Sequence, residues 1–172
     1  MIEFKLIEKY SDEIGEIVVK WYNDPEISPY LRPNFTGEDL KDMELEDVRN
    51  GYLSHPDKRL YGIYTDELLI GEVSIIKNFQ YLAKKTEKTA WISICLGNKD
   101  YWGKGIAKKA MNFLEKESKT LGYDRIELGV FENNLKAQNL YKQMGYEIIR
   151  IYSDFTYYNG SWYDDLRMEK YL

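Results

Sequence analysis

The stretch Tyr101-Trp102-Gly103-Lys104-Gly105-Ile106-Ala107 combines two glycines with the start of a predicted helix. Glycine lets the main chain approach a ligand without interference from a Cβ atom, and the first turn of a helix has N–H groups without intrahelical partners. These N–H groups lie at the positive end of the helix dipole, so the stretch predicts a site for an anion such as a pyrophosphate. A plain loop that needs glycine for its turn is the competing interpretation.

A second pattern lies further along the chain, in Asn134-Leu135-Lys136-Ala137-Gln138-Asn139-Leu140-Tyr141-Lys142-Gln143-Met144-Gly145-Tyr146. Together the two stretches resemble the GNAT superfamily of N-acetyltransferases. Its members carry Gln/Arg-x-x-Gly-x-Gly/Ala at the turn that binds the pyrophosphate of coenzyme A, and Asn-x-x-Ala-x-x-Leu-Tyr-x-x-x-Gly-Phe/Tyr further on. The first pattern is matched at Gly105 and Ala107, with Trp102 where Gln or Arg usually stands. The second is matched at Asn134, Ala137, Leu140, Tyr141, Gly145 and Tyr146.

The resemblance covers residues 60–171, and residues 155–168 are similar to the end of spermidine and ribosomal-protein N-terminal acetyltransferases. It implies an enzyme that transfers an acetyl group from acetyl-CoA, its co-substrate, to a primary amine by direct attack in a ternary complex. It also implies the GNAT acyl-CoA N-acyltransferase fold, with a mostly antiparallel mixed α/β sheet, a splayed parallel pair and helices on both faces. A non-catalytic acyl-CoA-binding module that has kept the fold is the alternative.

The resemblance also implies which residues bind the cofactor. Main-chain N–H groups between Gly103 and Lys108 would hold the pyrophosphate, and the backbone at Ile94, Cys95 and Leu96 would pair with the pantetheine arm. Asn134 would contact coenzyme A or hold the loop after its strand, and Lys104 and Lys108 would add charge or simply be solvated. The expected cofactor-binding residues are Ile94, Cys95, Leu96, Trp102, Gly103, Lys104, Gly105, Ile106, Ala107, Lys108 and Asn134.

Acetyl transfer to an amine needs a neutral amine, hydrogen-bond donors for the developing oxyanion and a proton for the departing thiolate. Tyr141 corresponds to the usual general acid of the family. A phenol has a pKa of about 10 and a thiol one of about 8.5, so full proton transfer to a free thiolate would be uphill. A hydrogen bond from Tyr141 that tightens as charge develops on the sulfur avoids most of this cost.

The general base is less clearly indicated. Related spermidine-type enzymes often carry a glutamate on the strand where this chain has Trp91. Glu72, in the predicted strand 68–77, is the nearest carboxylate in sequence that would point at the cleft, although an exposed strand position is the competing interpretation. A chain of water molecules is a further alternative, because a small fraction of an amine with a pKa near 10 is neutral at pH 7 to 8.

Three classes of acceptor are compatible with the sequence: a polyamine, an aminoglycoside-like small molecule and a protein N-terminal amine. The acidic balance of the chain, with a net charge of −5, favours a small cation. Aromatic and acidic side chains would line the acceptor cleft, or simply form a Tyr-rich surface. The candidates are Tyr22, Tyr30, Tyr52, Tyr157, Tyr158, Trp162 and Tyr163, with Asp24, Glu26, Asp154, Asp164 and Asp165.

Alternating and helical patterns predict the elements that position these residues. Strands are expected at 3–7, 60–65, 68–77, 89–96, 125–131, 146–157 and 162–171. Ser11 caps a first helix, Thr36 and Asp39 form a capping box for a second, and further helices span 106–121 and 135–144. Between the first two helices, Pro25, Pro29 and Pro33 predict a loop. The strand–helix–strand order around the third helix predicts a locally parallel pair of strands.

Bulk properties restrict the remaining possibilities. The 172 residues suit one N-acetyltransferase domain, residues 1–172, and a negative net charge does not favour nucleic acid or anionic lipid. The chain has one cysteine, Cys95, and one histidine, His55, so we expect no disulfide and no metal site, and Cys95 as a small core residue. Without a signal peptide or a membrane-spanning stretch we expect a cytoplasmic protein, with a homodimer possible by analogy.

Overall fold

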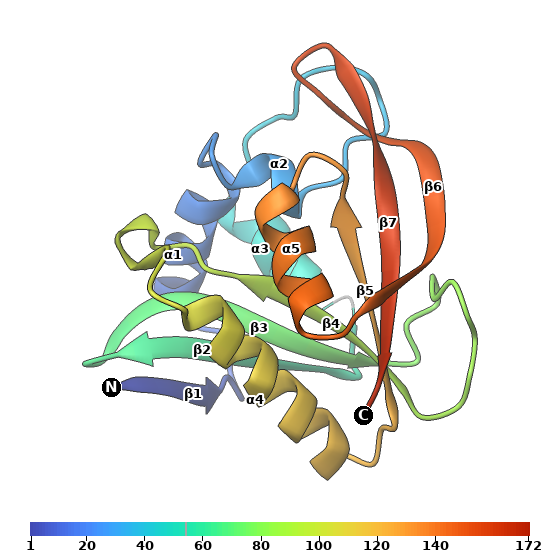
Figure 1. Ribbon diagram of the computed structural model, residues 1–172. Coiled ribbons are helices and arrows are strands. Elements are labelled where there is room, and N and C mark those ends of the chain that lie inside the picture. Colours follow the sequence, from blue (N-terminus) through green and yellow to red (C-terminus); the bar gives the residue numbers. More distant parts are fainter. Residues whose placement is uncertain (54) are drawn as a thin grey trace.

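The structure, a computed structural model, describes residues 1–53 and 55–172. Its centre is a seven-stranded mixed sheet in the order β1-β2-β3-β4-β5-β7-β6 (Figure 1). The strands are β1 (Ile2–Leu6), β2 (Lys58–Thr65), β3 (Leu68–Lys77), β4 (Thr89–Cys95), β5 (Arg125–Phe131), β6 (Glu147–Tyr158) and β7 (Ser161–Tyr171). The helices are α1 (Asp12–Tyr22), α2 (Ser28–Leu31), α3 (Leu45–Leu53), α4 (Ile106–Thr120) and α5 (Leu135–Gln143), with a 3-10 turn at Lys99–Tyr101.

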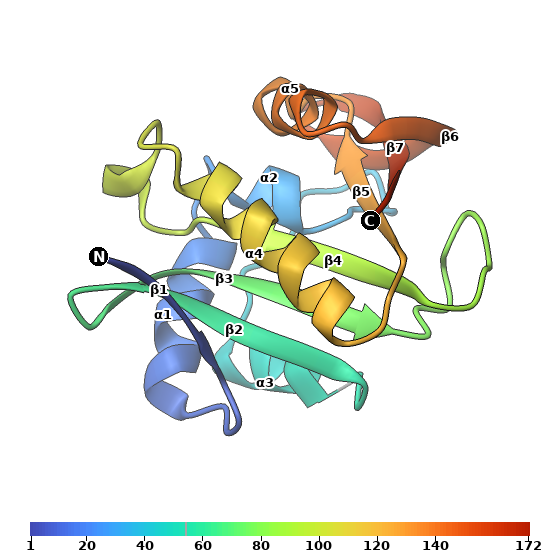
Figure 2. The same ribbon diagram turned by 60° about the horizontal axis from the view of Figure 1, so that its bottom comes forward.

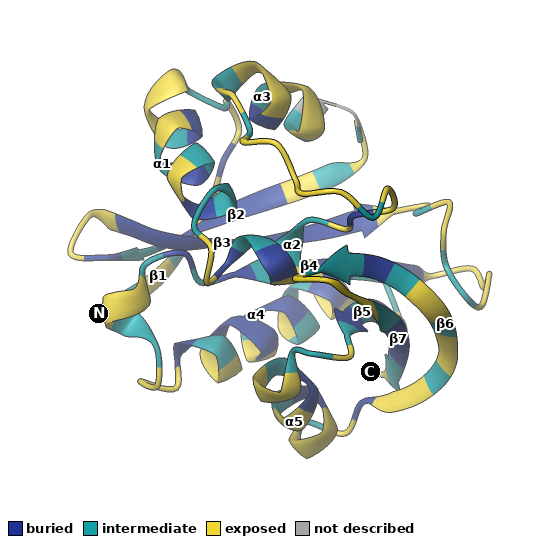
Figure 3. Cartoon of the chain, turned by 90° about the horizontal axis from the view of Figure 1, so that it is seen from above, coloured by how far each residue is buried: buried dark blue, intermediate teal, exposed yellow. Residues whose placement is uncertain are grey.

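The helices cover both faces of the sheet, as predicted. Figures 2 and 3 show α4 and α5 on one side and α1 and α3 on the other. The amphipathic face of α4 buries Ala110, Met111 and Leu114 completely against the sheet. On the opposite face, Val18 and Trp21 of α1 form a second, smaller core. The predicted fold class is therefore confirmed.

Short local patterns determine several of these elements. The Ser11 hydroxyl accepts a hydrogen bond from the Ile14 N–H at 3.3 Å and so caps α1. Asp66 and Glu67, with φ of 48° and 68°, form the tight turn between β2 and β3. Asn159-Gly160 joins β6 to β7 with both φ angles positive, as a two-residue hairpin turn requires.

Two predictions for residues 23–44 are wrong. The proline-rich loop contains the short helix α2, in which Pro29 sits in the first turn, where a missing N–H costs nothing. Thr36 does not open a helix, because its hydroxyl and N–H bond to the Asn34 side chain. The second long helix begins later, at Leu45, where the Asp47 carboxylate accepts the Glu44 N–H at 2.8 Å.

The parallel pair β4–β5 is present but short. Its register runs only from Thr89 opposite Arg125 to Trp91 opposite Glu127. Beyond these residues the two strands run apart (Figure 1), while β4 stays paired with β3 as far as Cys95. The edge of β4 that faces β5 therefore carries main-chain N–H and C=O groups outside the ladder.

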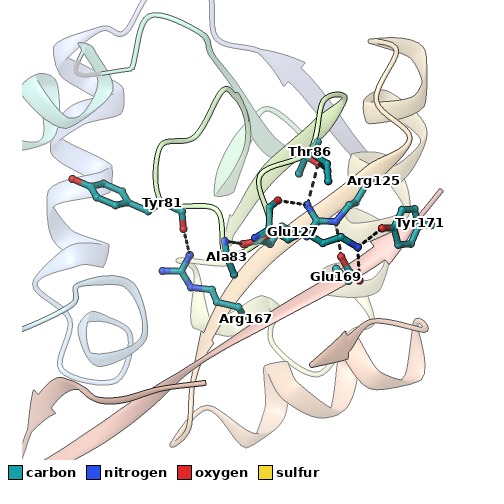
Figure 4. A network of polar contacts seen from close by, with 10 residues as sticks. Tyr81, Ala83, Thr86, Arg125, Glu127, Arg167, Glu169 and Tyr171 are labelled. Atoms are coloured by element: carbon teal, nitrogen blue, oxygen red, sulfur yellow. Dashed lines mark hydrogen bonds and ion pairs between the residues drawn. The ribbon is translucent and has the colours of Figure 1, made fainter. Parts of the chain in front are cut away.

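A buried ionic network lies where β4 and β5 are still paired (Figure 4). Arg125 is 1% exposed and binds Glu127 at 2.6 Å and Glu169 at 2.5 Å. The Glu127 carboxylate also accepts the main-chain N–H of Ala83 at 2.5 Å and that of Lys84 at 3.3 Å. The network therefore holds the connection between β3 and β4 against the sheet.

Replacing Glu127 with Gln should destabilise the protein, because it leaves the Arg125 guanidinium buried with less compensation. We expect the free energy of unfolding in urea to fall by roughly 3 kcal/mol. The matched control is Glu3→Gln, whose partner Lys5 lies in an exposed ion pair and whose loss should change the free energy of unfolding far less. Equal effects of the two substitutions would contradict a structural role for the buried network.

Candidate active site

A cleft of about 1790 Å³ passes from the N-terminal end of α4 to the opposite face of the sheet. It follows the gap between β4 and β5, and its walls include α1, α2, α5, the β3–β4 connection and the β6–β7 hairpin. The cleft therefore joins the predicted anion-binding turn to the face where an acceptor would enter. The sequence-predicted residues along it are Tyr22, Glu26, Tyr30, Glu72, Ile94, Cys95, Leu96, Trp102, Gly103, Gly105, Ile106, Ala107, Lys108, Asn134, Tyr141 and Asp165.

The glycine turn has an open surface on the cleft. Gly103 and Gly105 have φ of 73° and 72°, and a Cβ atom at either position would meet nothing within 4 Å. Within the described part of the chain, no hydrogen bond occupies the main-chain N–H groups from Gly103 to Lys108. Such a row of donors at the start of a long helix fits the two linked phosphates of coenzyme A.

The Trp102 side chain links this turn to the end of β4. Its Nε1 donates to the Leu96 carbonyl oxygen at 2.7 Å. The indole N–H therefore binds the Leu96 carbonyl group, which was expected to form a hydrogen bond with the pantetheine arm. The same hydrogen bond ties the glycine turn to the end of β4. Lys108 lines the cleft, whereas Lys104 lies over the Tyr101 ring at 5.0 Å and is absent from the lining.

Asn134 and its neighbour Asn133 differ in their hydrogen bonding. The Asn134 side chain caps α5 by accepting the Ala137 N–H at 3.2 Å, which matches the expectation that it holds the loop. The Oδ1 atom of Asn133 is buried beside the cleft and has no hydrogen-bond partner among the described residues. Asn133 was not predicted from the sequence. The sequence does not show which of two neighbouring asparagine side chains has no hydrogen-bond partner.

Tyr141 is buried in the wall of the cleft, with 7% of the residue exposed. Burial raises the pKa of its phenol to about 12. None of the hydrogen bonds found among the described residues uses its hydroxyl group, which is therefore available to a ligand. At neutral pH the side chain is protonated, so its hydroxyl group can donate a hydrogen bond into the cleft.

Glu72 lies on the α1 face of β3 and lines the cleft. It is 8% exposed, so the interpretation as an exposed strand residue is wrong. The Tyr22 hydroxyl donates to its Oε1 atom at 3.5 Å. Burial raises the pKa of Glu72, and the charge of Lys58 and the Tyr22 hydrogen bond offset part of that rise.

The aromatic lining differs from the predicted set. Of the predicted aromatic residues, only Tyr22 and Tyr30 line the cleft. The other lining rings come from Phe35, Phe79, Tyr81, Trp91, Tyr101, Trp102, Phe131, Tyr141, Tyr152 and Phe155. Trp91 stacks on Phe79 with ring centroids 4.4 Å apart. The position where related spermidine-type enzymes often carry a glutamate is therefore part of an aromatic wall in this protein. Phe79 lies between the predicted strands 68–77 and 89–96, and no pattern in the sequence indicated its place in this wall.

Asp165 and Arg167 form a buried pair in the same wall, at 2.5 Å. Gly129 makes room for this pair, because an added Cβ atom would lie 3.0 Å from Asp165 Oδ1 and 3.1 Å from the Trp91 ring. Asp165 is one of the acidic residues that the sequence predicted to line the acceptor cleft. Arg167 was not predicted as a cleft residue. Their convergence depends on the pairing of β7 with β5, which brings Arg167 opposite Gly129.

Other reactive groups do not form a second centre. Cys95 is buried, and burial together with the Glu72 charge raises the pKa of its thiol, which favours a core role over that of a nucleophile. A search of the described residues finds no group of three or more His, Cys, Asp or Glu side chains that could hold a metal ion. None of the described helices is both long and apolar enough to cross a membrane.

The fold and the site define an acyltransferase, and comparison with known proteins identifies the family. The sequence model of the acetyltransferase (GNAT) family matches residues 17–146, and the chain belongs to this family. Acetyltransferase PseH of Campylobacter jejuni is 25% identical over 162 residues, which cover 91% of this chain and 92% of that protein. The chain is an N-acetyltransferase that depends on acetyl-CoA.

Solved structures share the same fold. A putative phosphinothricin N-acetyltransferase superposes with a TM-score of 0.79 at 20% identity, covering 100% of this chain and 99% of that one. The spermidine N-acetyltransferase from Vibrio cholerae, in complex with CoA and spermine, gives a TM-score of 0.78 at 21% identity and covers 99% of this chain and 95% of that one. At these identities the likeness concerns the fold.

Replacing Glu72 with Gln should stabilise the protein at neutral pH. Because the pKa of Glu72 is raised above its ordinary value of 4.5, its contribution to stability is complete below pH 4.5 and is lost as the pH rises through the folded-state pKa. We expect the variant to have a higher thermal midpoint at pH 7.5, with a gain that becomes smaller toward pH 4.

The matched control is Glu16→Gln on the exposed face of α1, which should change the midpoint little at any pH. A lower midpoint for Glu72→Gln at pH 7.5 would mean that the charged carboxylate is stabilised by its partners, contrary to this expectation.

Proposed function

We propose that the enzyme transfers the acetyl group of acetyl-CoA to the primary amine of a small molecule by direct attack in a ternary complex. The observation that carries the proposal is one continuous cleft that has the glycine turn at one end and both Tyr141 and Glu72 in its walls. Donor and acceptor would enter from opposite faces of the sheet and meet where β4 and β5 part.

The cofactor would be held mainly by main-chain groups. The N–H groups from Gly103 to Lys108 would bind the pyrophosphate, with Lys108 adding charge beside them. The unpaired edge of β4 at Ile94 and Cys95 would pair with the pantetheine arm and donate to the thioester carbonyl. Acetyl-CoA supplies the activated carbonyl and a thiolate leaving group. The free Oδ1 of Asn133 would accept a hydrogen bond from the same ligand.

Tyr141 is proposed as the general acid. Its raised pKa, about 12, keeps the phenol protonated throughout the working pH range. It also makes complete proton transfer to a thiolate costly, so the group would act by a hydrogen bond that strengthens as negative charge develops on sulfur. The buried site strengthens that hydrogen bond, because little water competes for the donor.

Glu72 is proposed as the general base. A buried carboxyl group with a raised pKa is a better base than an exposed one and takes a proton from an ammonium group more readily. The Tyr22 hydroxyl would orient the carboxylate toward the cleft. A water molecule between the amine and Glu72 remains compatible with this role, since only one side of the carboxylate contacts Tyr22.

The cleft favours a small-molecule acceptor over a protein N-terminus. The aromatic connection between β3 and β4 lies over the cleft and is held down by Glu127. A spermidine N-acetyltransferase is among the proteins of the same fold, which agrees with a small amine substrate. A polyamine and an aminoglycoside-like molecule both stay candidate classes. A homodimer, a cytoplasmic location and a single domain over residues 1–172 stay predictions.

Substituting Tyr141→Phe tests the general acid. We expect kcat to fall about 100-fold, the lower end of typical general-acid contributions, while the dissociation constant for acetyl-CoA changes less than about twofold. The measurement is thiol release from acetyl-CoA with an amine panel, beside calorimetric binding of coenzyme A. Tyr146→Phe is the matched control, because its ring centre lies 6.0 Å from that of Tyr141. Parallel losses of kcat and of affinity would make Tyr141 structural.

Substituting Gly105→Glu tests the phosphate site. A side chain in the open turn should occupy the space proposed for the pyrophosphate and weaken coenzyme A binding by at least about 100-fold in calorimetry, with an unchanged circular dichroism spectrum. Gly122→Glu is the control, since Gly122 has a φ of 87°, equally open surroundings and a place at the other end of α4. Normal binding by Gly105→Glu would overturn the assignment.

A further inference from the structure

Arg167 indicates which chemical groups the acceptor carries besides its amine. This inference rests on the proposed function. We infer that the acceptor carries, in addition to its amine, an anionic oxygen group, a carboxylate or a phosphate, and that the Arg167 guanidinium binds it. Arg167 is a buried cation in the acceptor half of the cleft, with 7% of its side chain exposed.

Two hydrogen bonds hold the Arg167 guanidinium in place, and some of its N–H donors have no partner among the described residues. Nε donates to Asp165 at 2.5 Å. Nη1 donates to the main-chain oxygen of Tyr81 at 2.9 Å (Figure 4). None of the hydrogen bonds found among the described residues uses Nη2. A guanidinium has five N–H donors in a planar fork, and buried donors normally have partners. The remaining N–H groups therefore suit a ligand in the cleft.

Aromatic rings surround the Arg167 guanidinium. The Arg167 Cζ atom lies 4.8 Å from the ring centroid of Trp91, 5.2 Å from that of Tyr152 and 6.0 Å from that of Phe155. Rings around a guanidinium exclude water and limit its rotation, so a hydrogen bond from Nη2 to an anion would be strong and directional. A planar guanidinium whose N–H donors are already held in position is typical of sites that bind a carboxylate or a phosphate.

The acidic residues of the lining argue against a polycation. They are Glu26, Glu72 and Asp165, and each already has a partner in the chain. Glu26 binds Lys99 at 2.6 Å, Asp165 binds Arg167, and Glu72 receives the Tyr22 hydroxyl. Glu72 is the one carboxylate of the described lining whose partner is uncharged, so it can pair with one ammonium group, and the further ammonium groups of a polyamine would find no second such carboxylate. An anionic group would instead take the Arg167 donors that Asp165 leaves free.

The inference is tested with pairs of amines that differ in one anionic group. Glucosamine 6-phosphate against glucosamine examines phosphate, 4-aminobutyrate against butylamine examines carboxylate, and spermidine represents the polycations. Thiol release is measured at saturating acetyl-CoA. We expect the anionic member of at least one pair to have a kcat/KM at least about tenfold higher, which is the size of a charge-assisted hydrogen bond.

Arg167→Gln should reduce that ratio to within about twofold while leaving acetyl-CoA affinity unchanged, and Arg167→Lys should retain part of it. Arg150→Gln is the matched control, because Arg150 lies 5.7 Å from the Tyr152 ring but is exposed and outside the cleft lining. This control should keep the full ratio.

Equal or better use of the neutral amines or of spermidine would overturn the inference, as would an equal loss with every acceptor in Arg167→Gln. Absence of thiol release with every amine would instead count against the proposed function. In that case calorimetry on the coenzyme A complex decides the inference. Tighter binding of an anionic amine that Arg167→Gln abolishes supports it, and no such difference overturns it.

Discussion

The short pairing between β4 and β5 is the constraint on which the site depends. The two strands share a register only as far as Trp91 and Glu127, and the sheet then opens. At the paired end, the buried ions Arg125, Glu127 and Glu169 hold β5, β7 and the β3–β4 connection together. At the open end lies the cleft, through which, in the proposed function, a coenzyme bound at α4 would meet an acceptor on the α1 face. A continuous ladder would close this passage.

Buried polar groups serve two different purposes in this protein. Arg125 and Glu127 are fully paired and stabilise the paired end of the strands, since each compensates the desolvation of the other. Glu72 is compensated only in part, by the charge of Lys58 and the hydrogen bond from Tyr22, and burial raises the pKa of both Glu72 and Tyr141. We expect a buried Glu72 to lower the stability of the protein, a cost that proteins often carry at groups that take part in a reaction. The same wall contains Arg167, whose donors are only partly satisfied.

Local patterns in the sequence predicted most elements correctly, because their causes lie within a few residues. Ser11 caps the helix that follows it, and Asn159-Gly160 turns the last hairpin. The failure at Thr36 has a physical reason as well. Its hydroxyl accepts the Glu38 N–H at 3.3 Å but also donates to the Asn34 side chain at 2.9 Å, and the sequence does not show that this second contact forms. Gly103 and Gly105 of the turn have positive φ, a conformation that glycine adopts without a steric cost.

The sequence by itself determined the family, and it predicted the phosphate-binding turn and the general acid, because these depend on residue types at short spacing. Only the tertiary structure decided that Glu72 is buried in the cleft, that Trp102 binds the end of β4 and that Arg167 lines the cleft. These features depend on strand register, which brings residues distant in the chain to one face. Burial, charge compensation and unsatisfied donors follow from those long-range neighbours and not from the local order of residues.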